Sequence, residues 1–106
     1  MNEFKKIISV NIDIDALLKL GFQKENELDE WVLYVISNEI KSVFILNDKV
    51  IGEEMPYVLL GKIIIDLANN YIMFSTPVFS CLADNYYAEL SHIKKNLKEI
   101  GIEWEE

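Results

Sequence analysis

Few side chains in this chain of 106 residues could do chemistry. His92 is the only histidine, and Glu89 lies three residues before it, within one helical turn. A dinuclear metal site in a helical bundle needs two such Glu-x-x-His pairs and two further glutamates. Because the chain has a single copy and no second histidine, the pair is better explained as neighbours on a helix surface. The sequence predicts no metal site.

Cys81 is the only cysteine, so no disulfide can form within the chain. As a nucleophile it would need a base such as His92 and a third group to orient that base, and no such group is evident. We expect Cys81 to be a small buried hydrophobic residue instead. One histidine and no arginine also leave little to protonate a leaving group or to stabilise a phosphorane. We therefore predict no catalytic residue and no cofactor.

Neighbouring carboxylates occur at Asp13 with Asp15 and at Glu53 with Glu54. Such pairs could form a glycosidase-like dyad or a magnesium site. Acidic neighbours more often form a solvated face, and that is the interpretation we prefer. The four glycines are scattered singly, so no phosphate-binding loop is indicated. A small enzyme with an unrecognised carboxylate site is kept as an alternative.

The charge of the chain is more informative than any motif. Eighteen Asp and Glu residues outnumber ten lysines, there is no arginine, and the net charge is −8. This surplus repels nucleic acid and anionic membranes and favours a cationic partner. Recognition of phosphates and bases also relies on the bidentate guanidinium group, which is missing. We expect a protein partner and neither nucleic acid nor membrane.

Length and composition indicate a single domain over residues 1–106. About half of the residues are hydrophobic, which is enough to form a core without metals or disulfides. The longest uncharged run, residues 67–83, is too short and too polar for a membrane span of roughly 20 apolar residues. The amino terminus has only a short apolar stretch, so we expect an unexported, cytoplasmic protein.

The apolar pattern predicts an α+β fold, with an antiparallel sheet meander, a short N-terminal helix and a long C-terminal helix packed on one face. A strand is expected at residues 4–10. Asp13 or Asp15 can cap a short helix that ends at Gly21. Residues 23–30 are polar and acidic, and we expect an exposed loop there.

Two segments rich in β-branched and aromatic residues, 31–36 and 41–46, are expected to pair as a hairpin, followed by a turn at Asn47-Asp48. Residues 56–70 are ambiguous, because Pro56 suits a helix start whereas Gly61 and three consecutive isoleucines favour a strand. We favour the strand, with a tight turn at 69–70 and a partner strand at 71–75. A buried helix over residues 56–69 is the alternative.

The C-terminal helix has the clearest pattern. Thr76 as cap and Pro77 at the first helical position predict its start, and Gly101 its end. Asp84-Asn85 could divide it into a short and a long helix. Five apolar residues at spacings of three and four form the face expected to cover the sheet: Tyr86, Leu90, Ile93, Leu97 and Ile100.

Acidic residues gather at positions 25–30, at 53–54 and in the tail at 103–106, and tryptophans stand next to two of these clusters. Aromatic anchors ringed by carboxylates suit a tight interface with a cationic partner. An alternative without any interface has equal weight. Trp31 would begin a strand and lie in the core, the tail would fray, and the acidic surface would serve only solubility. The candidate partner-binding residues are Glu25, Glu27, Asp29, Glu30, Glu53, Glu54, Trp104 and Glu105.

With these features the chain resembles the small immunity proteins of bacterial polymorphic-toxin systems, particularly contact-dependent growth inhibition. The resemblance covers the whole chain and rests on size, acidity, cysteine poverty and strands closed by a C-terminal helix, without a residue motif. It implies a cytoplasmic antidote that binds one cognate toxin domain, often a basic nuclease, and blocks its active site or a nearby surface. The carboxylates of residues 25–30 and 53–54 would then mimic phosphate charge.

Two further functions are kept open. An acidic adaptor or phage-type inhibitor of a nucleic-acid-binding protein would use the same acidity against another target. A weak homodimer, as in a structural protein, is also compatible with the high apolar fraction.

Overall fold

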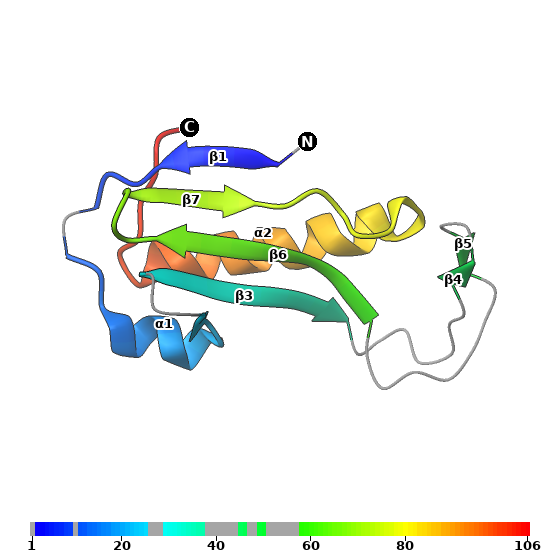
Figure 1. Ribbon diagram of the computed structural model, residues 1–106, viewed down its shortest axis with the longest axis horizontal. Coiled ribbons are helices and arrows are strands. Elements are labelled where there is room, and N and C mark those ends of the chain that lie inside the picture. The colour runs from blue at the N-terminus through cyan, green and yellow to red at the C-terminus, as the bar shows by residue number, and fades with distance from the viewer. Residues whose placement is uncertain (1, 10, 26–28, 38–44, 47–48, 51–57) are drawn as a thin grey trace.

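The computed structural model describes residues 2–9, 11–25, 29–37, 45–46, 49–50 and 58–106. Five strands form one antiparallel sheet in the spatial order β1-β7-β6-β3-β2 (Figure 1). Their bounds are Glu3–Lys6 for β1, Gln23–Lys24 for β2, Glu30–Ser37 for β3, Val58–Asp66 for β6 and Tyr71–Phe74 for β7. The helices are α1, Ile14–Leu20, and α2, Ala83–Glu99. The predicted α+β class, with a short N-terminal helix and a long C-terminal one, is confirmed.

Helix α1 begins and ends where its sequence predicts. The Asp13 carboxylate accepts hydrogen bonds from the backbone N–H groups of Asp15, at 3.0 Å, and Ala16, at 3.3 Å. At the other end Gly21 has a φ of 105°, a conformation that suits glycine. Asp13 is therefore a helix cap, which accounts for this carboxylate without a dyad or a magnesium ion.

Strand β6 settles the ambiguity over residues 56–69 in favour of a strand. It lies at the centre of the sheet, between β3 and β7, where β-branched residues pack on both sides. The turn that joins β6 to β7 spans residues 67–70, longer than the tight turn predicted at 69–70, and Asn70 has the positive φ, 55°, that asparagine tolerates. Pro56 lies outside the described residues.

The predicted hairpin between residues 31–36 and 41–46 is wrong for residues 45–46, and residues 41–44 lie outside the described residues. Strand β3 pairs with β6 from Glu30 opposite Asp66 to Ser37 opposite Val58, and with β2 on its other side. Ile45–Leu46 (β4) instead pairs with Lys49–Val50 (β5) in a separate two-stranded sheet. The long apolar strand β6 offers β3 a better partner than its neighbour in sequence. The turn predicted at residues 47–48 lies outside the described residues.

Helix α2 begins later than predicted, at Ala83 instead of Thr76. The chain between β7 and α2 stays extended because it continues to bond to β6: Ser75 N–H donates to the Lys62 carbonyl at 3.0 Å, and Val78 N–H donates to the Leu60 carbonyl at 2.9 Å. A 3₁₀ turn at Ser80–Leu82 then leads into the helix. Asp84 lies in the first turn of α2 and does not divide it.

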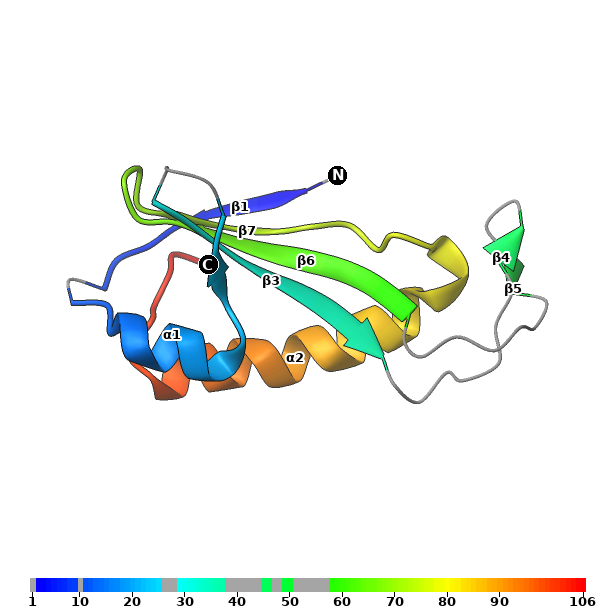
Figure 2. The same cartoon turned by 60° about the horizontal axis from the view of Figure 1, so that its bottom comes forward.

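Helix α2 covers one face of the sheet with the residues its periodicity predicts. Tyr86, Leu90 and Leu97 are buried, and Ile93 and Ile100 are partly buried against the same core. Both helices lie on this one side of the sheet (Figure 2). None of the described helices has the length and apolar character needed to cross a membrane.

After Gly101 the chain returns to the sheet and closes the outer edge of β1. Glu105 N–H donates to the Lys6 carbonyl at 2.9 Å, and Ile8 N–H donates to the Glu103 carbonyl at 2.9 Å. Trp104 bridges to Ile7 between these bonds. The tail therefore covers the edge of the sheet at the C-terminal end of β1.

Candidate functional site

The sheet face away from the helices carries an apolar row that crosses four strands. Phe4 of β1 lies opposite Met73 of β7, Met73 opposite Ile64 of β6, and Ile64 opposite Val32 of β3. These residues alternate with those that face α2, such as Ile63, Ile65 and Ile72, which belong to the main core. We call this side of the sheet the open face, because no described helix covers it (Figure 2).

The open face exposes large apolar side chains. Phe4 is 62% exposed, Tyr34 is 48% exposed and Ile36 is 40% exposed. Two shallow hollows adjoin at Tyr34 and Leu59. One, of about 430 Å³, extends over Lys62 and Ser75 towards Val78, and the other, of about 420 Å³, extends over Val32 and Ile36 towards Gln23. The open face thus has hollows as well as exposed apolar side chains.

Carboxylates gather at one end of the open face. Glu25 N–H donates to the Glu30 carbonyl at 3.2 Å, which continues the pairing of β2 with β3. The Tyr34 hydroxyl donates a 2.7 Å hydrogen bond to the Glu25 carboxylate, and this bond raises the pKa of Tyr34 above its ordinary value. Glu30 in turn lies directly opposite Asp66. Two of the predicted site residues, Glu25 and Glu30, are therefore brought together beside a third carboxylate.

Asp66 is 5% exposed and organises the β6–β7 turn. It accepts hydrogen bonds from the backbone N–H of Asn69, at 3.0 Å, and from the Asn69 amide, at 2.9 Å. Burial on its own raises the pKa of Asp66, but the hydrogen bonds from Asn69, Tyr71 and Ala68 together hold that pKa below its ordinary value. Burial, followed by the charges of Asp66 and Glu30, raises the pKa of Tyr71. Asp66 is therefore held ionised, close to Glu30.

The other predicted site residues are dispersed. Asp29 forms an ion pair with Lys24 at 3.5 Å, with both side chains exposed. Glu105 lies in the tail beside β1, at the edge of the sheet opposite to β2. Glu27, Glu53 and Glu54 lie outside the described residues. The acidic residues near β2 and those of the tail therefore do not form one patch.

Trp104 is 7% exposed, and its packing in the core is sufficient reason for a tryptophan at this position. Its ring packs edge-on against Phe74, with centroids 5.5 Å apart, and the ammonium of Lys98 lies 5.2 Å from its centroid. Trp31 is likewise buried in the core. Neither tryptophan presents its ring to a partner in this conformation.

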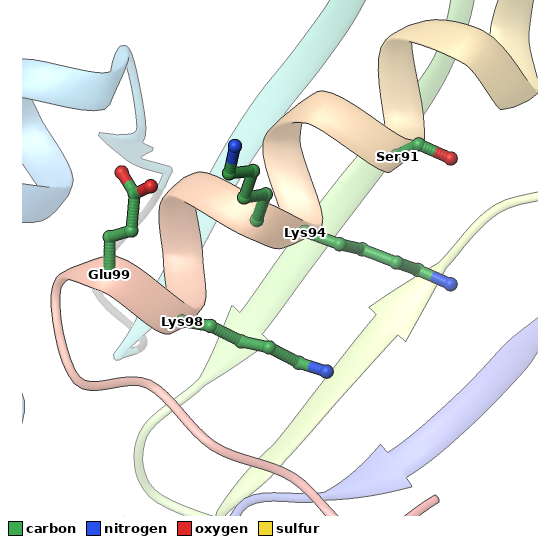
Figure 3. Close-up of a pocket in the computed structure, with 5 residues that line it drawn as sticks. Ser91, Lys94, Lys98 and Glu99 are labelled. Atoms are coloured by element: carbon green, nitrogen blue, oxygen red, sulfur yellow. The ribbon is translucent and has the colours of Figure 1, made fainter.

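A third hollow, of about 540 Å³, lies along α2 and is lined by lysines (Figure 3). Lys94 and Lys98 extend in the same direction, away from Glu99. Lys94 Nζ lies 4.5 Å from the centroid of the Phe74 ring, and Lys98 also pairs with Glu106 at 3.5 Å. These contacts explain the two lysines as covers for buried aromatic rings.

The residues considered for nucleophilic or metal chemistry are not assembled. Cys81 is exposed, so the expectation that it is buried is wrong: the later start of α2 leaves it in the 3₁₀ turn, where Leu82 takes the buried position. His92 is exposed on α2. Among the described residues, no three His, Cys, Asp or Glu side chains lie close enough to hold a metal ion.

Sequence reasoning missed Phe4, Tyr34 and Ile36 as the exposed apolar residues of the site. The available signal was the unbroken apolar run of residues 31–36, which makes β3 apolar on both faces. Such a strand is either covered on both faces or exposes one apolar face to solvent. The sequence does not distinguish these two cases, because they depend on how the helices pack.

The chain was compared with protein-family models, with curated protein sequences and with solved structures, and no match was found. The open face and its carboxylates are therefore the basis on which a function can be argued.

Proposed function

We propose that this protein is an inhibitor of the immunity-protein class, which binds a basic toxin domain in the cytoplasm through the open face of its sheet. The observation that carries the proposal is the one-sided coverage of the sheet. Both helices pack on one face, and the other exposes Phe4, Tyr34 and Ile36 beside a group of carboxylates.

The open face has the composition of a protein interface. Specific interfaces combine an apolar, aromatic centre with a polar or charged rim. Here Tyr34 and Ile36 stand beside hollows that a partner's side chains can fill, and Phe4 is a separate exposed aromatic residue at the opposite edge. Tyrosine is also enriched among residues that contribute most to binding. Exposed apolar surface of the kind formed by Tyr34 and Ile36 is typical of a binding site.

Charge supports a basic partner. Glu30 and Asp66 lie directly opposite each other on neighbouring strands, an arrangement that repulsion makes unfavourable in the free protein. Glu25 adds a third carboxylate at the same end. A lysine or arginine of a partner placed there would relieve this repulsion, and the net charge of −8 would steer the approach.

Inhibition by this surface needs no catalytic residue, because covering a basic cleft is enough to exclude its substrate. For a nuclease, Glu25 and Glu30 would occupy positions that substrate phosphates otherwise take, and the buried Asp66 would add its negative charge behind them. The same role is open to Glu27, Glu53 and Glu54. Their contribution is tested by substituting each one and measuring binding to the partner.

The test is co-expression with the protein encoded immediately upstream, followed by binding measurements with its purified C-terminal domain. We expect a stoichiometric complex that suppresses toxicity and weakens steeply as salt rises. The double variant Glu25→Lys, Glu30→Lys should slow association by orders of magnitude, whereas Glu99→Lys, Glu103→Lys, with the same charge change elsewhere, should have a much smaller effect. No complex, or one that neither variant pair distinguishes, would rule out the proposed surface.

A further inference from the structure

The open face of this acidic protein carries a lysine beside its exposed tyrosine. Lys62 of β6 lies directly opposite Tyr34 of β3, and its side chain is exposed. Its backbone groups point away from β3: Lys62 N–H donates to the Ser75 hydroxyl at 2.8 Å, and Ser75 N–H donates to the Lys62 carbonyl at 3.0 Å. Tyr34 and Lys62 are therefore a non-hydrogen-bonded pair, the kind in which facing side chains lie closest. A partner that covers Tyr34 also covers Lys62.

The ammonium of Lys62 forms no ion pair with any described residue. Three other lysines do pair with carboxylates, namely Lys5, Lys24 and Lys98. The Tyr34 hydroxyl is directed to Glu25 instead of to Lys62. Asp66 lies four residues along β6 from Lys62, which is roughly 13 Å at about 3.3 Å per residue. In the free protein, water therefore solvates this ammonium.

Lys62 lines the hollow of about 430 Å³ on the open face. Tyr34, Leu59, Pro77 and Val78 bring apolar groups to the same hollow. A partner side chain that fills it would displace water from the ammonium. Desolvation of a charge without a compensating partner is strongly unfavourable, and lysine is depleted from the cores of protein interfaces. A partner seated on this part of the open face must therefore compensate Lys62.

We infer that Lys62 determines which partner the open face accepts, by pairing with an aspartate or glutamate of that partner. The inference rests on the proposed function, because it requires the open face to be the binding surface. The basic partner then places cations against Glu25 and Glu30 and one carboxylate roughly 13 Å away, over Lys62. A uniformly basic surface sets like charges against Lys62 and is rejected, since specificity is a difference of affinities to which repulsion contributes.

Charge favours a carboxylate of the partner over an uncharged acceptor. A hydrogen bond between an ammonium and a carboxylate is roughly twice as strong as one between neutral groups. A backbone carbonyl would leave the positive charge of Lys62 uncompensated in a hollow without water. A lysine kept only for solubility would instead extend its ammonium to the rim of the interface and stay hydrated. The two roles predict different effects of removing the charge.

The test is the kinetics with which Lys62 variants bind the purified C-terminal domain of the protein encoded immediately upstream. Lys62→Glu should speed dissociation by at least about 30-fold, and Lys62→Met by about tenfold, because each leaves the partner's carboxylate unpaired in the interface. Lys62→Arg keeps the charge and should retain most of the affinity. Net charge alone predicts the opposite, because Lys62→Glu makes the protein more acidic and more attractive to a basic partner.

Lys95→Glu is the matched control, because Lys95 is also exposed but lies on α2, on the other side of the sheet. It should leave dissociation unchanged and speed association slightly. If Lys62→Glu does not speed dissociation, or if both variants speed it equally, the inference is overturned while the proposed surface stands. A wild-type protein that binds no toxin domain contradicts the proposed function and this inference with it.

Acetylation of lysine amines, read by mass spectrometry, shows without any variant whether the partner covers Lys62. Lys62 should react in the free protein, where it is exposed, and should be protected in the complex. Lys95 should react in both. A Lys62 that reacts equally in the complex would place its ammonium in water and contradict the inference.

The carboxylate itself can be found by double-mutant cycles. Each aspartate and glutamate of the toxin domain is replaced in turn by asparagine or glutamine, and dissociation is measured from the wild-type protein and from Lys62→Met. One acidic residue should speed dissociation from the wild-type protein by about tenfold and have little effect on dissociation from Lys62→Met. If the effect of every acidic residue is the same with both proteins, Lys62 pairs with no carboxylate and the inference fails.

Discussion

A Cβ atom on Gly61 would lie 2.5 Å from Cε1 of Tyr86, closer than two non-bonded carbon atoms approach in proteins. Gly61 lies in the middle of β6, and the fully buried Tyr86 ring extends from α2 onto it. The Tyr86 hydroxyl donates a 2.8 Å hydrogen bond to the Ser75 carbonyl. The Ser75 hydroxyl accepts from Lys62 N–H, also at 2.8 Å. Gly61 thus gives Tyr86 the space it needs to join the helix to the sheet.

Gly61→Ala should lower the free energy of unfolding by about 1–3 kcal/mol, because the added methyl group forces the ring or the strand to move. Chemical denaturation monitored by tryptophan fluorescence measures the effect. Gly101→Ala is the control for backbone strain: Gly101 has a φ of 90° but no atom within 4 Å of the added Cβ. Its cost should be about 1 kcal/mol.

The steric cause can be isolated by repeating Gly61→Ala in a Tyr86→Leu background. With the ring removed, Gly61→Ala should cost little, and the coupling between the two positions should be on the order of 1 kcal/mol or more. Equal costs in both backgrounds would show that the ring is not the reason for glycine at this position.

Tyr86→Phe should cost about 1 kcal/mol at neutral pH through loss of the bond to Ser75. Burial raises the pKa of Tyr86 above its ordinary value of 10.0. The unfolded chain therefore loses this proton first, so the stability contribution is complete below about pH 10 and is lost as pH rises through the raised pKa. Denaturation across that range should show a shallower alkaline loss for Tyr86→Phe than for the wild-type protein.

Local signals predict much of this fold. The Asp13 cap, the Gly21 stop, the Asn70 turn and the apolar periodicity of α2 each depend on residues within a few positions of one another. The partner of β3 and the start of α2 could not be predicted this way. Both depend on β6, which pairs with β3 and bonds to the segment after β7. Those competing contacts are between residues far apart in sequence.

The site could be predicted only in part. Clustering in the sequence correctly placed Glu25 and Glu30 together, because β2 and β3 are connected through a short segment. It could not add Asp66, which reaches Glu30 only through the pairing of β3 with β6. The exposed fractions of Tyr34 and Val35, neighbours in an apolar run, differ because one faces away from α2 and the other faces it. Composition alone cannot predict which of the two side chains faces α2.

Asp66→Asn should destabilise the protein by about 1–2 kcal/mol at pH 7. Both carboxylate oxygens of Asp66 accept hydrogen bonds, whereas an amide has one oxygen that accepts and an NH₂ group that can only donate. The folded state holds the pKa of Asp66 below its ordinary value of 3.8. The corresponding stability is present above that value and is lost as pH falls through the lowered pKa. Unfolding measured between about pH 7 and pH 3 should show a smaller acid loss for Asp66→Asn. Asp84→Asn, in the first turn of α2, controls for removal of a carboxylate and should keep the acid loss.

Glu30→Gln should make the free protein more stable while making it a poorer inhibitor. Removing one of two opposed carboxylates relieves the repulsion with Asp66, and we expect a gain of a few tenths of a kcal/mol that shrinks as salt rises. The same change removes a charge that the proposed basic partner would neutralise, so association should slow. Glu99→Gln has the same charge change on α2 and should produce neither effect. Asp66 is needed for the β6–β7 turn, so Glu30 is the member of the pair that binding to a partner would explain. A Glu30→Gln variant with unchanged or reduced stability would contradict the expected repulsion.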